Sequence, residues 1–323
     1  MAGFPPADTI GARFTPGPLA LGLQGGGSFG AFTWGVLDRL LEQDGIGWDM
    51  LSGTSAGAVN AVLLADGLAE GGPAAARRKL AWFWEQVSRR TPSGASLMAV
   101  AALGASLRWV SPFALDPPEL TPLRGLLEEA VDFERLRAAG SRGPRLLIAA
   151  TRVRDGRPML FRTPEITQEM VLASACLPFL GQPVLIGGEA CWDGGFSANP
   201  PLRDLVLESS APDVLLVRLL PAEQEAVPHQ SHDIARRVQE MTFNAPLQRE
   251  EEEVAELRRA CAGRRLFRSG RCRRLERLRL HRIAAPEVVE GLERESPLDT
   301  GWPLLQRLMQ AGRGAAEGWL AGG

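Results

Sequence analysis

The chain has 323 residues, enough for one large domain or two small ones, and its 45% hydrophobic and 23% charged residues are ordinary for a globular protein with a buried core. A net charge of −2 gives no sign of a nucleic-acid partner. The longest apolar run, Leu97 to Leu107, is too short for a membrane span, which needs about 20 residues. Residues 1–17 form a Gly- and Pro-rich lead-in without the apolar segment of a signal peptide, so we expect a soluble cytoplasmic protein.

The first 66 residues alternate between strand and helix patterns. Short apolar runs predict strands, and apolar residues at helical spacing or runs of small residues predict helices. In chain order these are a strand at 19–23, a helix at 31–41, a strand at 48–52 and a helix at 58–65. Strands joined through helices run parallel, so this order predicts an α/β sheet.

Further elements continue the same pattern to the end of the chain. Strands are predicted at 145–153, 214–220 and 278–283, and helices at 73–90, 122–139, 167–176, 231–260 and 300–320. The apolar stripe of the last helix predicts core packing, with an interaction surface as the alternative.

Two segments admit a functional and a structural interpretation. Residues 91–122 are loop-rich and apolar, and form either a lid or acyl-chain wall over the site or an insertion that packs on the core; their apolar residues include Met98, Leu103, Trp109, Phe113 and Leu115. Residues 258–282 carry many arginines and form either a solvated basic face or a contact for anionic lipid head groups.

The four cysteines suggest no metal site. Cys176, Cys191, Cys261 and Cys272 show neither a CxxC spacing nor a Cys/His ligand pattern. We therefore expect four free thiols, and no metal or organic cofactor.

The first chemical motif is Gly53-Thr54-Ser55-Ala56-Gly57, which matches G-x-S-x-G between a predicted strand and a predicted helix. A serine on such a sharp turn exposes its hydroxyl at the carboxyl end of the sheet. The helix that follows directs amide N–H groups and the positive end of its dipole toward the site. This context predicts that Ser55 is a nucleophile.

The second motif is the glycine-rich loop from Gly25 to Gly30, which follows the first strand. Consecutive glycines allow several backbone N–H groups to point at one position, which suits an oxyanion. The same residues satisfy G-x-G-x-x-G, a dinucleotide fingerprint. That alternative requires an acidic residue at the end of the second strand, whereas Asp49 precedes the apolar part of that strand.

The third motif is Asp193-Gly194-Gly195, within a glycine-rich segment. Asp-Gly is a common turn dipeptide. As a functional alternative, Asp193 lies on a compact loop that reaches Ser55, where partial desolvation makes its carboxylate basic enough to accept the serine proton.

These three motifs, in this order, resemble the patatin-like phospholipase family over residues 19 to 202. Three further segments support the resemblance, namely residues 37–41 (LDRLL), 173–178 (ASACLP) and 199–201 (NPP). The resemblance implies a three-layer α/β/α sandwich with a mostly parallel central sheet. It also implies a catalytic domain at 18–220, with a C-terminal extension at 221–323 packed on it.

The resemblance further implies a serine acyl hydrolase with a Ser-Asp dyad and no catalytic histidine. Ser55 is then the nucleophile and Asp193 the general base. Backbone N–H groups of Gly25, Gly26, Gly27, Ser28 and Ala56 form the oxyanion hole. The expected partner is a lipid or fatty-acyl ester, with peripheral membrane contact and no nucleic acid. Phe29 departs from the family, whose glycine loop often carries Arg or Lys there, and this loosens the assignment to phospholipids.

Two other interpretations stay open at the level of sequence. An α/β-hydrolase esterase could use Ser55, Asp193 and His281 as a triad, although alternation in the 278–283 strand favours a structural histidine. Alternatively, a pseudoenzyme could bind lipid without turnover.

Overall fold

An eight-stranded sheet runs through the centre of the part of the chain that the computed structural model describes, which comprises residues 14–91, 122–178, 180–223, 227–262, 270–292 and 295–322. In order across the sheet, the strands are β5 (Val184–Ile186), β6 (Glu189–Asp193), β3 (Arg145–Arg152), β2 (Gly47–Thr54), β1 (Pro18–Leu23), β7 (Asp213–Arg218) and β8 (Arg279–Ala284), and β4 (Pro158–Arg162) also pairs with β3.

The five strands predicted from the sequence form the parallel part of this sheet. Neighbouring strands in the order β3-β2-β1-β7-β8 are all parallel. The strands β4, β5 and β6 are antiparallel to their neighbours and were not predicted.

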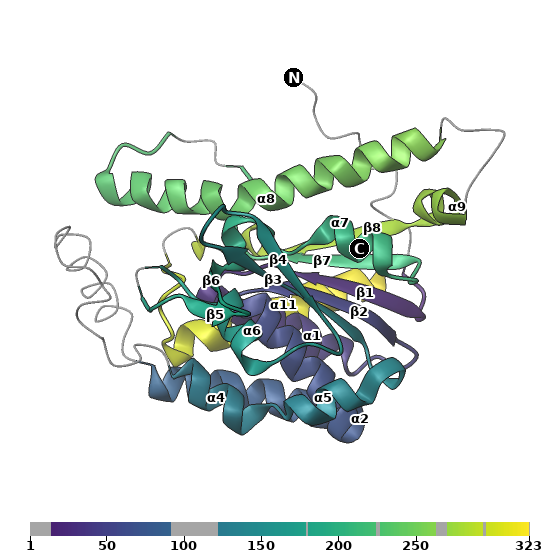
Figure 1. Ribbon diagram of the computed structural model, residues 1–323, viewed down its shortest axis with the longest axis horizontal. Coiled ribbons are helices and arrows are strands. Elements are labelled where there is room, and N and C mark those ends of the chain that lie inside the picture. The colour runs from purple at the N-terminus through teal and green to yellow at the C-terminus, as the bar shows by residue number, and fades with distance from the viewer. Residues whose placement is uncertain are drawn as a thin grey trace.

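Helices cover both faces of the sheet, which gives the expected three-layer α/β/α architecture (Figure 1). The layer with α1 (Gly30–Leu40), α2 (Ala56–Arg90) and α11 (Trp302–Ala321) also holds α4 (Leu123–Ala130) and α5 (Phe133–Ala139), whereas α7 (Leu202–Glu208), α8 (Ser231–Ala262) and α9 (Gly270–Arg277) lie on the other face. The short helices α6 (Gln168–Ser174) and α10 (Ala285–Val288) complete the described set.

Each face of the sheet contributes to its own apolar core, because successive strand residues point to opposite faces. Leu21 and Leu51 join the core beneath α1, α2 and α11. Their neighbours Ala20 and Met50 join the core beneath α7 and α8. The parallel strands are therefore apolar on both faces, which explains why they read as continuous apolar runs.

Three of the helix predictions differ from the structure in how the helices are divided. The helix predicted at 122–139 is two helices, since the Asp132 carboxylate caps α5 by accepting N–H bonds from Glu134 (3.0 Å) and Arg135 (2.9 Å). The helices predicted at 58–65 and 73–90 both lie in α2, which leaves helical geometry at Gly71 and Gly72.

The prediction of four free thiols is wrong for one pair. Cys261, in α8, and Cys272, in α9, form a disulfide, while Cys176 and Cys191 are free. The bonded cysteines are eleven positions apart in the sequence, and the placement of α9 against α8 brings them together. Cysteine spacing alone could not reveal that placement.

The proposed lid at 91–122 lies outside the described residues apart from Thr91 and Pro122. This includes Leu103 and Trp109, so the choice between lid and insertion stays a prediction. Within the described part of the chain, no helix has the length and apolar character needed to cross a bilayer.

Helices α1 and α11 cross in unusually close contact at two glycines. A Cβ atom on Gly35 would overlap the carbonyl oxygen of Met309, and one on Gly312 would overlap that of Phe32. Both obstacles are backbone atoms, which cannot swing aside as a side chain can. The crossing therefore depends on the absence of side chains at these two positions.

We predict that Gly312→Ala lowers the free energy of unfolding by about 1–3 kcal/mol, because the added methyl group forces the two backbones apart. Gly318→Ala, in the same helix with open space around the glycine, is the matched control. It should raise the stability by up to about 1 kcal/mol through helix propensity alone. Urea denaturation measures both changes, and a neutral or stabilising Gly312→Ala would contradict the close crossing.

Candidate active site

Ser55 occupies the sharp turn between β2 and α2 that the G-x-S-x-G motif predicts. Its backbone has φ 54° and ψ −125°, and it is the single non-glycine residue with positive φ in the described part of the chain. Such a conformation costs roughly 1–3 kcal/mol and persists only where the surroundings enforce it. Here the Ser55 N–H donates a hydrogen bond of 2.9 Å to the buried Ser174 Oγ, which holds the turn.

The glycine loop after β1 lies directly against this turn. A Cβ atom on Gly25 would lie 2.8 Å from the Cβ of Ser55, so a larger residue there would push the loop away from the serine. Gly27 lines the same cavity as Ser55. The two motifs, which we identified separately in the sequence, are therefore adjacent in space.

Two of the loop amides that we expected in the oxyanion hole already have acceptors. The Gly25 N–H donates to Asn199 Oδ1 at 2.7 Å, and the Ser28 N–H donates to the Pro297 carbonyl at 2.8 Å. The N–H groups of Gly26 and Gly27 have no acceptor among the described residues. These two amides are therefore the loop donors that remain available to a ligand, and Ala56 adds its own N–H at the start of α2.

We had expected a compact loop to bring Asp193 to the serine. Strand pairing does so instead. Asp193 is the last residue of β6 and pairs with Ala150, while the preceding β3 residue, Ala149, pairs with Thr54. This register brings the carboxylate to the end of β2, where Ser55 follows. The Asp193 N–H donates to the Cys176 carbonyl at 2.8 Å, which fixes the backbone there.

The Asp193 carboxylate is fully buried and only partly hydrogen-bonded. Its Oδ1 accepts the Gly195 N–H at 2.8 Å, whereas its buried Oδ2 has no hydrogen bond of regular geometry within the described residues. Burial raises the pKa of Asp193 to about 7, opposed by the Gly195 N–H and by the Ser55 hydroxyl, which faces the carboxylate. Catalytic hydrogen bonds are often loose before substrate binds. The group thus has the basicity and the vacant oxygen that proton abstraction requires.

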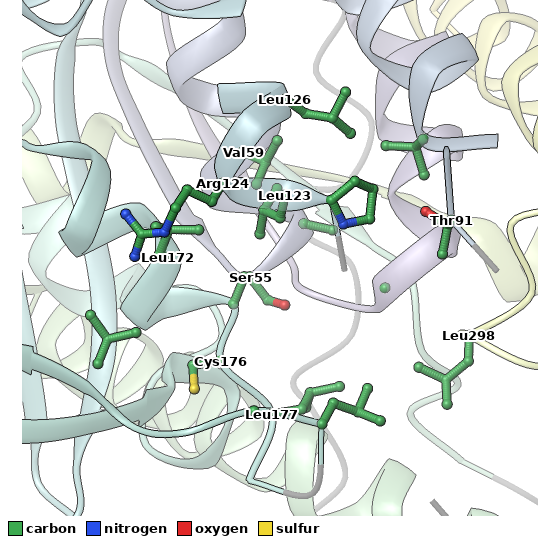
Figure 2. A pocket seen from close by; sticks show the side chains of 18 of the residues that line it. Ser55, Val59, Thr91, Leu123, Arg124, Leu126, Leu172, Cys176, Leu177 and Leu298 are labelled. Atoms are coloured by element: carbon green, nitrogen blue, oxygen red, sulfur yellow. The ribbon is translucent and has the colours of Figure 1, made fainter. Parts of the chain in front are cut away.

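Ser55 opens into an apolar cavity of about 650 Å³. In Figure 2 its hydroxyl points into this space, with Val59, Leu123 and Leu126 on one side and Leu177 on the other. Cys176 lines the cavity too, but burial raises the pKa of its thiol to about 11, with a further contribution from the nearby Asp193 charge. The thiol therefore stays protonated at neutral pH and is a poor nucleophile.

His281 has a structural position away from this site. Its Nε2 lies 2.7 Å from Asp213 Oδ1, and its ring packs edge-on against Phe14 and Trp319. It lines neither of the cavities that contain Ser55. The Ser55–Asp193–His281 triad is therefore not assembled.

The dinucleotide alternative also lacks its acidic partner. Asp49 lies near the beginning of β2, where it accepts hydrogen bonds from Ser209 (2.7 Å) and the Ser210 N–H (2.8 Å). The glycine loop follows the opposite, carboxyl end of β1. Across the described ranges, no group of His, Cys, Asp and Glu side chains could hold a metal ion.

Sequence reasoning missed the residues that position these groups. Ser174 accepts the Ser55 N–H, and Asn199 accepts the Gly25 N–H while its Nδ2 donates to the Phe243 carbonyl at 3.0 Å. Both belong to segments that supported the family resemblance. Along the chain, however, Ser174 lies 119 residues from its partner, and Asn199 lies 174 and 44 residues from its two partners. Spacing alone carries no signal for such contacts.

Comparison with protein families agrees with this geometry. The model of the patatin-like phospholipase family matches residues 21–206, more than half of the chain. The chain belongs to this family. The match includes the glycine loop, Ser55 and Asp193 of this patatin-like protein, and it ends before α8.

Two solved structures resemble the patatin-like chain at low identity. VipD from Legionella pneumophila is 15% identical with a TM-score of 0.39, and the alignment covers 96% of this chain and 67% of VipD. The type III effector ExoU is 18% identical with a TM-score of 0.37, and the alignment covers 96% of this chain and 54% of ExoU. This chain thus spans about half the length of ExoU. No functionally curated protein matches the sequence.

We predict that kcat/KM for ester hydrolysis has an acidic limb with an apparent pKa of about 7. The sign follows from the chemistry, since only the deprotonated Asp193 can accept a proton, so the rate falls as pH drops through the pKa. A pH–rate profile on a substrate without a titrating group measures the limb. A flat profile down to pH 5 would contradict the raised pKa.

Burial of Asp193 should also weaken the fold at neutral and higher pH. In the unfolded chain the carboxyl ionises near 3.8, whereas in the folded protein it holds its proton up to about 7. The contribution of this group to the free energy of unfolding is therefore fully present below about pH 4 and is lost as pH rises through about 7. Asp193→Asn removes the effect, so its stability relative to wild type should increase between pH 4 and pH 8, by about 1.4 kcal/mol for each unit of the pKa difference. Urea unfolding at both pH values tests this, and a constant difference would contradict it.

Proposed function

We propose that this protein is a serine acyl hydrolase that cleaves carboxylic esters of lipids, with Ser55 as nucleophile and Asp193 as general base. One observation carries the proposal: a buried carboxylate, whose pKa is about 7 and whose Oδ2 has no regular hydrogen bond within the described residues, interacts with the hydroxyl of a strained serine that opens into an apolar cavity. Membership of a family of lipid acyl hydrolases supports the same reaction class.

In the first half-reaction, Asp193 Oδ2 takes the hydroxyl proton as Ser55 Oγ attacks the ester carbonyl. The carbonyl oxygen becomes an oxyanion that the free N–H groups of Gly26 and Gly27, with that of Ala56, are available to stabilise. Each such donor contributes about 3–4 kcal/mol at the transition state. The C–O bond to the alcohol then breaks, and the leaving oxygen takes the proton from Asp193, which leaves an acyl-serine.

In the second half-reaction, Asp193 takes a proton from water as the water oxygen attacks the acyl-serine. The same amides stabilise the second oxyanion. Ser55 Oγ then leaves and recovers its proton from Asp193, and the carboxylic acid is released. Every proton moves between the substrate, water and these two side chains, so the proposed steps use no metal or organic cofactor.

A fatty-acyl ester is the substrate class that the cavity supports best. Leucine, valine, phenylalanine and tryptophan side chains dominate the 650 Å³ space beside Ser55. Phe29 is buried at the position of the glycine loop where the family is expected to carry Arg or Lys. The loop therefore offers no cation at this position to bind a phosphate group. The proposal therefore covers neutral lipid esters as well as phospholipids.

The peripheral membrane contact and the cytoplasmic location stay predictions. Part of the arginine-rich segment 258–282 forms α9, and residues 263–269 lie outside the described part. The pseudoenzyme alternative is addressed by the assay below.

We predict that Ser55→Ala and Asp193→Asn each lower kcat on p-nitrophenyl esters by about a thousandfold or more, because removing either member of a nucleophile–base pair disables both half-reactions. Ser55→Ala should also lose labelling by a fluorophosphonate. His281→Ala, with circular dichroism to verify folding, should keep most of the activity.

Each contrary result has a definite meaning. A folded but inactive His281→Ala would overturn the dyad in favour of the triad. Persistent labelling of Ser55→Ala would assign the nucleophile elsewhere. Wild-type protein that neither turns over nor becomes labelled would be a pseudoenzyme.

A further inference from the structure

Two cavities, and not one, meet at Ser55. Besides the 650 Å³ cavity, a second one of about 350 Å³ is lined by Ser55 and Gly27 and extends toward α8. A tetrahedral ester intermediate on Ser55 carries two further groups in addition to the oxyanion, namely the acyl chain and the alcohol. The site therefore has one cavity for each.

Asp193 distinguishes the two cavities, since it lines only the smaller one. In the proposed reaction the proton that Asp193 takes from Ser55 must pass to the leaving oxygen. That transfer requires hydrogen-bond reach between the carboxylate and the alcohol. An alcohol in the larger cavity would lie on the side of Ser55 that Asp193 does not line.

We infer that the smaller cavity binds the leaving alcohol and the larger cavity binds the acyl chain, with Pro297 and Leu298 as the partition between them. This inference rests on the proposed function and adds the orientation of the substrate.

The partition comes from the C-terminal part of the chain, beyond the residues that match the family. Pro297 and Leu298 line both cavities, as do Gly27, Ser55 and Leu177, and they are the two of these residues that come from the C-terminal part. The Pro297 carbonyl accepts the Ser28 N–H at 2.8 Å, which anchors the segment on the glycine loop. In Figure 2, Leu298 lies across the larger cavity from Leu172 and beyond Ser55. A substrate must therefore pass its two arms on either side of this segment.

The polar lining of the smaller cavity indicates the class of alcohol. Arg236 is the one arginine or lysine among its described lining residues, and it pairs with Asp233 at 3.0 Å and approaches Glu240 at 3.7 Å. Glu295, which also lines this cavity, pairs with Arg307. Since its one cation is already paired with carboxylates, the cavity suits a polar alcohol without net negative charge, such as glycerol, better than a phosphate monoester.

Two isomeric esters test the orientation of the substrate, because one carries its long chain in the acyl group and the other carries it in the alcohol. Methyl decanoate has a long acyl chain, and decyl acetate has a long alcohol. Val87→Phe narrows only the larger cavity, and Gln239→Phe, on the exposed side of α8, narrows only the smaller one. Neither residue belongs to the catalytic groups, and each variant is the control for the other.

We expect Val87→Phe to lower kcat/KM on methyl decanoate about tenfold, equivalent to about 1.4 kcal/mol, with decyl acetate nearly unchanged. Gln239→Phe should do the reverse. The opposite assignment, or equal losses on both esters in both variants, would overturn the inference. Wild-type protein should also favour 1-decanoylglycerol over the corresponding glycerol phosphate ester, and the reverse preference would overturn the class of alcohol.

Failure of this inference is separable from failure of the proposed function. If wild type is labelled by a fluorophosphonate at Ser55 but the two variants do not discriminate between the isomers, only the orientation is wrong. If no labelling occurs, the nucleophile itself is wrong. Thermal unfolding of both variants verifies that the losses arise in a folded protein.

Discussion

The site depends on a buried carboxylate beside which the described residues place no neutralising cation. Asp193 receives one backbone N–H bond, and burial leaves its pKa near 7. An arginine beside it would stabilise the charge but would also lower the pKa and occupy the oxygen that takes the serine proton in the proposed reaction. The protein instead holds the carboxylate in place through its backbone, with β6 paired to β3 and the Asp193 N–H bonded to Cys176. The strand pairing thus keeps the Asp193 carboxylate buried and basic, which lowers the free energy of unfolding at neutral pH.

The sequence predicted those parts of the site that depend on local geometry. A glycine loop and a G-x-S-x-G turn each follow a strand and precede a helix, and their form depends on neighbouring residues. The positions of the turn at Ser55 and of the loop at Gly26 and Gly27 could therefore be located in advance, whereas their catalytic roles stay predictions. The parallel strands were equally clear, because burial on both faces makes them continuous apolar runs. The short antiparallel strand that carries Asp193 was missed, since five residues of mixed burial with glycines on both sides read as a turn.

The contacts that the sequence could not predict depend on how separate segments of the chain come together. Asn199 and Pro297 remove the Gly25 and Ser28 amides from the expected oxyanion hole, and neither pairing leaves a trace in residue spacing. The disulfide between Cys261 and Cys272 depends on the placement of α9 against α8. Each of these contacts joins segments whose relative position only the complete fold determines.

The glycine crossing of α1 and α11 has a consequence for how the site evolves. Helix α1 begins where the glycine loop ends, and α11 begins four residues after Leu298. The crossing at Gly35 and Gly312 therefore fixes the position at which the C-terminal segment with Pro297 and Leu298 contacts the glycine loop. A slip by one helical turn would displace the segment by about 5.4 Å along the helix and would change the shape of both cavities that the segment lines. Substitutions at this distant crossing could thus alter which esters are accepted while every residue around Ser55 stays the same.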